Sequence, residues 1–356
     1  VAVGYLSLST EDGHGRNVAI GKAALRNLDA GADAYNVAVG FEAGTAVTTG
    51  IENTLIGGGV GASLTSGSYN VAIGRSALAT EDGHGKNIAI GYKALYDQNA
   101  GADAFNVAVG HQAGENVTTG IYNTLIGGKA GDALTTGNAN IAIGQDALGS
   151  EDTGSDSIAI GRNALAAQDY NGSAYNIGIG RAAGKEVTTG NSNTIIGGLA
   201  GDALTTGSNN VAIGYLALST EDAHGRNVAI GRQALKDQDA GIDAYNVAIG
   251  YNAGMNISTS SYNTLIGGLA GDALTTGGYN VAIGYQALST EDTQGLNTAV
   301  GTYALLNLNA GANAYNTAVG YNSGQAMTTG VQNTIVGGMA GDALTTGQFN
   351  VAIGTY

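Results

Sequence analysis

The sequence predicts an all-β fold, a parallel β-solenoid of about 21 coils of 17 or 19 residues, and three observations support it. A pentad of the type Asn-Val-Ala-Ile-Gly opens twenty times, with Ser157 alone replacing Asn. Successive openings lie 19, 17, 17 and 17 residues apart, and this four-coil pattern repeats every 70 residues. Glycine and β-branched residues recur too often for helices, and no 3.6-residue apolar stripe persists. We expect one continuous repeat array over residues 1–356.

Each position of the pentad predicts one part of the coil. The second and fourth residues, such as Val18 and Ile20, are β-branched and point the same way in a strand, so we expect them to form the inner face. The third residue, usually Ala, points the other way, and its small size indicates another surface close by. The fifth residue is Gly in all twenty copies, which indicates a turn. The V-T-T-G segments predict a second short strand in some coils.

The Asn side chains that open the coils are expected to lie directly above one another. An amide ladder along the stack would satisfy their hydrogen bonds. The first positions of the predicted ladder and turn are Asn17, Asn36, Asn53 and Asn70, with Gly21, Gly40, Gly57 and Gly74.

One coil in four carries a bulky third pentad residue. Because the other coils have Ala there, we interpret this residue as a knob on the outer face that contacts a partner chain. The predicted oligomer interface consists of Leu55, Leu125, Ile195, Leu265 and Ile335. It predicts a parallel homo-oligomer, with a trimer favoured, and stacking end to end is a further expectation.

Composition and charge exclude several classes of partner. The formal net charge of −15 argues against binding to a nucleic-acid backbone. No run of about 18 apolar residues is present, so no membrane span is expected. Val1 and Val351 occupy the same position of the coil, five 70-residue units apart, and we expect the chain to be an excerpt of a longer fibre.

The tandem pentads resemble the head repeats of trimeric autotransporter adhesins, and similar repeats occur in phage tail-fibre proteins. This resemblance covers the whole chain. It implies a left-handed parallel β-roll in which three chains run side by side. It further implies an extended fibre outside the cell, on a cell surface or on a virion, with a host receptor, a cell-surface receptor or a glycan as partner.

Acidic turns supply the candidate metal ligands. His14, His84 and His224 each lie two residues after a Glu-Asp pair that ends in Asp12, Asp82 or Asp222, which predicts either a solvated acidic turn or a weak divalent-cation site. Asp29 and Asp33, in the longer coil, are either ordinary turn residues or ligands of Ca²⁺. The solvated turns are the favoured interpretation, so no cofactor is expected.

Repetition favours a structural role over catalysis. Ser, His and carboxylate residues form no unique constellation in the sequence, so we expect a structural fibre or adhesin shaft and no enzyme. The alternative is a ligand-binding solenoid that presents rows of Tyr, Asp/Glu or Thr to a glycan, a divalent cation or ice. The aromatic residues that precede the Asn, such as Tyr245 and Tyr262, are either a sugar-stacking row or a stack that staples adjacent coils.

Overall fold

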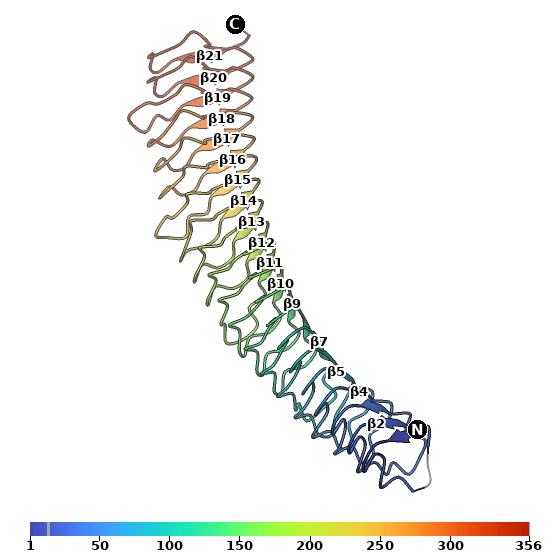
Figure 1. Ribbon diagram of the computed structural model, residues 1–356. Coiled ribbons are helices and arrows are strands. Elements are labelled where there is room, and N and C mark those ends of the chain that lie inside the picture. Colours follow the sequence, from blue (N-terminus) through green and yellow to red (C-terminus); the bar gives the residue numbers. More distant parts are fainter. Residues whose placement is uncertain (13–14, 356) are drawn as a thin grey trace. The chain divides into compact units, whose positions relative to one another are not determined.

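The computed structural model describes residues 1–12 and 15–355, which form two compact units, residues 1–176 and 177–356. Each unit is a parallel β-solenoid with one short strand per coil, and the strands follow one another in chain order (Figure 1). The described residues contain no helix, in agreement with the predicted fold class.

The strands are two or three residues long and coincide with the second to fourth pentad positions. The first unit contains β1 (Ala2–Val3), β2 (Val18–Ile20), β3 (Val37–Val39), β4 (Thr54–Ile56), β5 (Val71–Ile73), β6 (Ile88–Ile90), β7 (Val107–Val109), β8 (Thr124–Ile126), β9 (Ile141–Ile143) and β10 (Ile158–Ile160). The second contains β11 (Ile177–Ile179), β12 (Thr194–Ile196), β13 (Val211–Ile213), β14 (Val228–Ile230), β15 (Val247–Ile249), β16 (Thr264–Ile266), β17 (Val281–Ile283), β18 (Thr298–Val300), β19 (Thr317–Val319), β20 (Thr334–Val336) and β21 (Val351–Ile353).

Strand pairing is parallel and joins equivalent residues of consecutive coils. In β2 and β3, Val18 pairs with Val37 and Ala19 with Ala38. The remainder of each coil is irregular, so the expected second strand is wrong for the V-T-T-G segments, which form bends. Their backbones still bond from coil to coil, as where the Thr48 N–H donates to the Thr65 carbonyl at 2.9 Å. Inter-coil hydrogen bonds therefore continue beyond the sheet.

The opening Asn side chains form a buried ladder between coils. The Oδ1 atom of Asn17 accepts the backbone N–H of Asn36 at 2.8 Å, and Asn36 repeats this bond to Asn53 at 2.8 Å. The Nδ2 atom of Asn36 donates to the Gly50 carbonyl at 2.8 Å, across its own coil. The link to Asn70 follows the same pattern, with 2.9 Å from its N–H to Asn53. Since buried amides are costly when unpaired, this ladder fixes the register of neighbouring coils.

A glycine turn ends each strand because the coils approach one another too closely for a side chain. Gly21 has φ +131°, and a Cβ atom there would lie 2.2 Å from the carbonyl oxygen of Gly40. Gly40, Gly57 and Gly74 show the same positive φ and the same close approach to the next coil. Any other residue would break the stack at this point.

The buried face of the strands is the one that was expected to lie outside, and the expected inner face is partly exposed. Ala19 and Ala38 have no exposed surface, whereas Ile20 is 38% exposed and Val18 is partly exposed. The middle residue of the strand therefore faces the interior, where it joins the buried post-turn residue Ala24. Propensity of β-branched residues for strands reflects fit to a pleated surface and does not select the buried face. The small Ala marks the narrowness of the coil's own interior and not the approach of a partner.

The predicted knobs lie in the core, so their assignment to an oligomer interface is wrong. Leu55, Leu125, Ile195, Leu265 and Ile335 are each 0% exposed in the single chain. Being enclosed by their own coil and its neighbours, they cannot reach another chain.

One glycine in the same coil and one in the preceding coil make room for each of these bulky residues. A Cβ atom on Gly44 would lie 2.6 Å from a methyl carbon of Leu55, and one on Gly61 would lie 3.2 Å from the other methyl. Gly114 and Gly131 make the same room for Leu125, at 2.6 and 2.8 Å. The other two coils of each 70-residue unit, which are not next to a bulky strand residue on this side, carry Leu instead of Gly at this post-turn position, such as the buried Leu25. The interior volume is thus balanced between neighbouring coils, which gives the 70-residue period a physical basis.

Substitution of adjacent residues in β8 tests which face is buried. We expect Leu125→Ala to lower the free energy of unfolding by about 2–5 kcal/mol, because it leaves a cavity between Gly114 and Gly131. Ile126→Ala, the matched change on the exposed face, should cost less than about 1 kcal/mol. Urea denaturation followed by circular dichroism measures both losses. Equal losses would contradict the assignment of faces.

Candidate functional site

Buried glutamates occur once in every four coils, at the twelfth residue counted from the opening Asn. Neighbouring coils place Leu64 and Gln98 at the same position as Glu81, and all three are buried. The glutamates with no exposed surface are Glu81, Glu151, Glu221 and Glu291. The expectation of a fully solvated acidic turn is therefore wrong for the glutamate, while the following aspartate, as at Asp82, is exposed. Alignment of the coils by their Asn residues would have placed each glutamate in a column of core residues.

Each buried carboxylate is held by the turn that follows it. The Oε1 atom accepts a backbone N–H three residues later, from Gly154 to Glu151 at 2.7 Å and from His84 to Glu81 at 3.1 Å. The same bond joins the N–H of His224 to Glu221 at 3.2 Å. Because the bond closes the turn, the glutamate has a structural reason to point inward.

Burial makes the charged form of these carboxyl groups less favourable. Desolvation raises the pKa of Glu81 and of Glu151, against the opposing effect of their hydrogen bonds. Desolvation also raises the pKa of Glu221 to about 7, with the negative charges of Asp239 and Asp222 adding to the shift. Desolvation likewise raises the pKa of Glu291 to about 7. The carboxyl groups of Glu221 and Glu291 therefore titrate near neutral pH.

The structure groups two of the predicted metal-ligand pairs with a buried glutamate. Glu81, Asp82 and His84 place ligand atoms within 4.8 Å of one another, and Glu221, Asp222 and His224 do the same. Glu151, Asp152 and Asp169 form a third group at the equivalent place, without a histidine. Asp12 is exposed, and His14 lies outside the described residues.

The two aspartates of the long coil do not form a calcium site with each other. Asp33 pairs with Arg16 of the preceding coil at 3.0 Å and accepts the N–H of Gly15 at 3.3 Å. Asp243 repeats this pairing with Arg226 at 2.8 Å. Asp33 therefore ties the long coil to its neighbour, while Asp29 is exposed.

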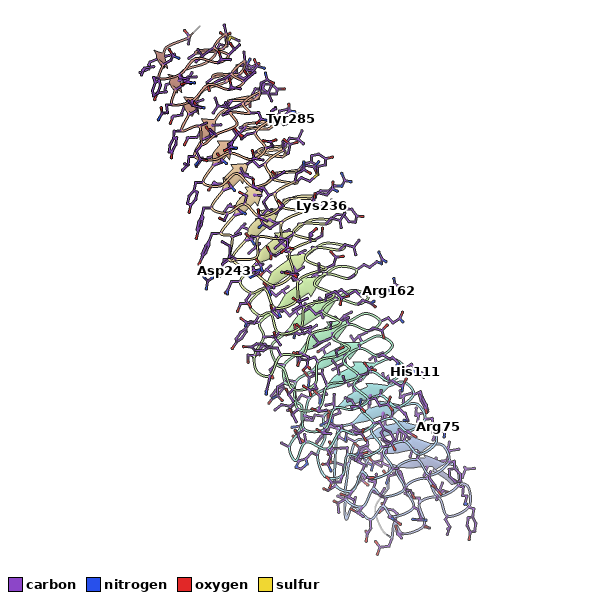
Figure 2. All side chains as sticks on the ribbon, turned by 90° about the vertical axis from the view of Figure 1, so that its left-hand side faces the viewer. Arg75, His111, Arg162, Lys236, Asp243 and Tyr285 are labelled. Carbon is purple, nitrogen blue, oxygen red and sulfur yellow. The ribbon has the colours of Figure 1, made fainter. Side chains whose placement is uncertain are left out.

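Aromatic residues that precede the Asn stack from coil to coil. In the second unit the ring centroids of Tyr245 and Tyr262 are 5.6 Å apart, and those of Tyr262 and Tyr279 are 5.0 Å apart. Arg226 extends this column at 5.4 Å from the ring of Tyr245. Figure 2 shows, within this unit, that Asp243 projects from the edge opposite that of Lys236 and Tyr285. The stacked rings thus connect adjacent coils, and their outer surfaces remain exposed to solvent.

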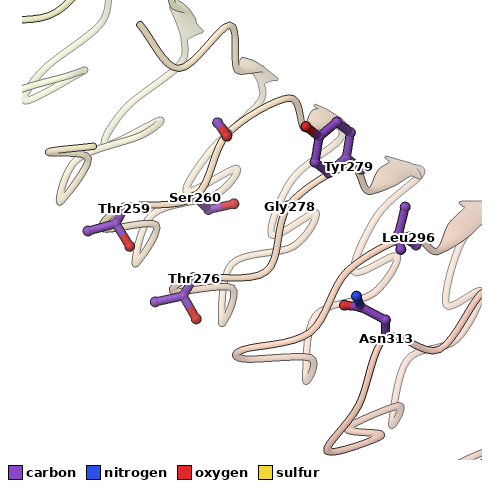
Figure 3. Close-up of a pocket in the computed structure, with 8 residues that line it drawn as sticks. Thr259, Ser260, Thr276, Gly278, Tyr279, Leu296 and Asn313 are labelled. Carbon is purple, nitrogen blue, oxygen red and sulfur yellow. The ribbon is translucent and has the colours of Figure 1, made fainter. Parts of the chain in front are cut away.

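A hollow of about 360 Å³ opens beside the last ring of this column (Figure 3). Its lining combines polar and apolar surface and consists of Thr259, Ser260, Ser261, Thr276, Gly278, Tyr279, Leu296 and Asn313. Gly278 is responsible for part of the space, because equivalent coils have Ser68, Asn138 or Ser208 there.

Side chains at this position elsewhere accept a hydrogen bond from the preceding coil. Ser68 accepts the N–H of Ile51 at 3.1 Å, and Ser208 accepts the N–H of Asn191 at 3.0 Å. Gly278 offers no such acceptor to the N–H of Ser261, which lines the hollow. The hollow thus combines an aromatic surface with hydroxyl, amide and backbone groups.

Comparison of the chain with protein-family models, curated proteins and solved structures found no match. Among the described residues, no helix has the length and apolar character needed to cross a membrane.

The raised pKa values predict that stability falls as pH rises. A carboxyl group that titrates at about 7 in the folded chain and near its ordinary 4.5 in the unfolded chain adds stability that is complete below pH 4.5. That contribution is lost as pH rises from about 4.5 through about 7. We expect the urea midpoint of the unmodified protein to fall between pH 5 and pH 8.

Replacement of Glu221 and Glu291 by Gln should make this fall smaller. Glutamine has no charge to desolvate, and it occupies the same column at Gln98, where it is buried. Glu186→Gln, on an exposed side chain, is the control and should keep the full pH dependence. An unchanged pH dependence in the double variant would show that the two buried carboxyl groups do not cause it.

Proposed function

We propose that the chain is a structural shaft, part of a fibre or adhesin outside the cell, on a cell surface or on a virion, with no catalytic role. The observation that carries the proposal is the recurrence of one coil, with one core and one amide ladder, through both units. A solenoid in which each coil contacts its neighbours gains length without a change of architecture. The resemblance to adhesin heads and tail fibres supports the same role.

The outer face of the strands is the surface through which such shafts would associate. The second and fourth pentad positions carry Val, Ile or Thr in every copy and no charged residue. Ile56, Ile88 and Ile126 are 37–38% exposed. The other second and fourth pentad positions from Val18 to Val336 are all at least partly exposed. A large apolar surface of this kind is typical of a contact site.

A second copy of the chain is the partner that this face fits best. Its apolar rows recur at the spacing of paired strands, about 4.8 Å, so a partner that matches them along many coils needs the same repeat. It carries no charges that would select an oppositely charged partner. The proposed assembly is a parallel homo-oligomer, with three chains as the number that the family resemblance implies.

Charges placed on this face should separate the chains. We expect sedimentation equilibrium to give a multiple of the 35.2 kDa chain mass for the unmodified protein and a single chain for Ile126→Asp with Ile266→Asp. Thr119→Asp, which adds a charge at an exposed bend outside the strands, is the control and should leave the assembly intact. A folded, unmodified protein that sediments as a monomer would contradict self-association.

The hollow beside Tyr279 favours a second candidate function, the binding of a sugar. The ring of Tyr279 is 60% exposed and offers an apolar surface for a pyranose, while Thr276, Ser261 and Asn313 offer hydrogen-bond partners. An aromatic surface beside a few polar groups is a common arrangement in small-molecule sites. In this case the shaft would also carry a ligand site.

Two substitutions test sugar binding at the hollow. Gly278→Ser should abolish it, because the new side chain occupies the hollow and can accept the Ser261 N–H as Ser208 does for Asn191. Tyr279→Ala should weaken it at least tenfold. The measurement is saturation-transfer NMR with a panel of neutral disaccharides and trisaccharides. Tyr175→Ala, on an exposed ring outside the hollow, is the control. Absence of any signal with the unmodified protein, or a signal unaffected by Gly278→Ser, would rule out this site.

A further inference from the structure

Two histidine-bearing turns within the described residues leave buried ligand atoms without hydrogen-bond partners. Glu81 has no exposed surface, and its Oε2 atom has no hydrogen-bond partner. The Nδ1 atom of His84 is also buried and unpaired, 4.0 Å from the Oε1 atom of Glu81. Since buried polar atoms are normally satisfied, this arrangement calls for a missing partner.

The same unsatisfied arrangement recurs 140 residues later. The Oε2 atom of Glu221 and the Nδ1 atom of His224 are buried and unpaired, and Nδ1 lies 3.8 Å from Oε1. The backbone N–H of Ala240 also faces this carboxylate. Recurrence on a different copy of the turn makes an accidental side-chain placement a poor explanation.

The two described turns without histidine pair both oxygens of the glutamate, and at Glu291 the Oε2 atom accepts the backbone N–H of Ala310 at 3.5 Å. Glu151 accepts the N–H of Gly154 through Oε1 at 2.7 Å and the Nε2 of Gln168 through Oε2 at 2.9 Å. Beside Glu81, the corresponding Gln98 donates instead to the carbonyl of Thr118 at 3.1 Å. The carboxylate oxygen that Gln168 occupies in one turn is therefore left open in the turn that contains a histidine.

We propose that each histidine-bearing turn is a binding site for a divalent transition-metal ion of the Zn²⁺ type. The ligands are Glu81, Asp82 and His84 in the first unit, and Glu221, Asp222 and His224 in the second. Two carboxylates and one imidazole suit Zn²⁺, whereas Ca²⁺ takes oxygen ligands. The imidazole nitrogen thus distinguishes this site from a calcium turn.

The geometry permits coordination after a small movement of exposed side chains. Ligand atoms around a tetrahedral Zn²⁺ are about 3.3 Å apart, because the metal–ligand distances are about 2.0–2.1 Å. In each turn the three ligand atoms already lie within 4.8 Å of one another. Asp82 is exposed and the His84 side chain is 37% exposed, so both can close on an ion held by the fixed Glu81 carboxylate. A water molecule would complete the coordination.

An ion in these sites would compensate the buried negative charge of the glutamate. It would also join the buried glutamate to the exposed end of the turn, so that the turn is fixed by more than one backbone hydrogen bond. Since the ion binds the folded chain, it should stabilise the coil by mass action.

Calorimetric titration of the EDTA-treated, dialysed chain with Zn²⁺ alone tests the proposal. We expect the number of ions bound per chain to fall by two when His84→Gln and His224→Gln are combined, since Gln occupies this place naturally at Gln294. Asp82→Asn with Asp222→Asn should weaken the same two sites at least tenfold. These aspartates are exposed, so this second variant tests the site even if the histidine variant fails to fold. Ca²⁺ in place of Zn²⁺ should give no saturable heat at these sites.

Two controls separate these sites from general binding to histidine or to acidic groups. His111→Gln removes an exposed histidine that belongs to none of the acidic groups, and Asp152→Asn alters the acidic turn whose glutamate is already satisfied. Neither should change the number of ions bound. The proposal is overturned if the unmodified chain binds no Zn²⁺, or if the His84→Gln and His224→Gln variant keeps the full number.

Discussion

Close, in-register stacking of coils is the constraint on which the rest of the structure depends. At the turn after each strand, the backbones of successive coils approach so closely that a Cβ on Gly21 would lie 2.2 Å from the next coil's carbonyl oxygen. Beside that turn the Asn36 amide bonds to its own coil through Nδ2 and to the next through Oδ1. A shift of one residue would break the ladder and the turn together, so every coil repeats the register of the last.

The narrow interior determines which coils can be neighbours. The middle residue of each strand faces inward, and where it is bulky its own coil and the preceding coil both carry a post-turn Gly. Gly44, Leu55 and Gly61 show this exchange of volume across two consecutive coils. Packing at the density of a protein interior allows little error, so the order of coils within the 70-residue unit is a packing requirement. A pattern of surface contacts would impose no such order.

Polar residues enter the core where the acidic turn meets the longer coil. Glu151 closes its own turn and receives Gln168 from the following coil, so all its oxygens are used. Beside Glu81 and His84, Gln98 donates instead to the carbonyl of Thr118, and the Oε2 atom of Glu81 has no hydrogen-bond partner.

The sequence by itself determined the parallel solenoid, the coil length, the glycine turn and the amide ladder, because each follows from strict recurrence along the chain. It could not decide which face of the strand is buried, since Val18 and Ala19 are both compatible with a sheet interior and alternate with the same period. Only the tertiary structure decided this, because the opposite wall of the same coil lies close to the middle residue of the strand. Leu55 is therefore a core residue and does not lie on a contact surface. The burial of Glu81 was equally inaccessible to local reasoning, because a Glu-Asp pair beside glycine is typical of an exposed turn. Its inward direction follows from hydrogen bonds to the turn and from the column of core residues above and below it, which exist only once the coils are stacked.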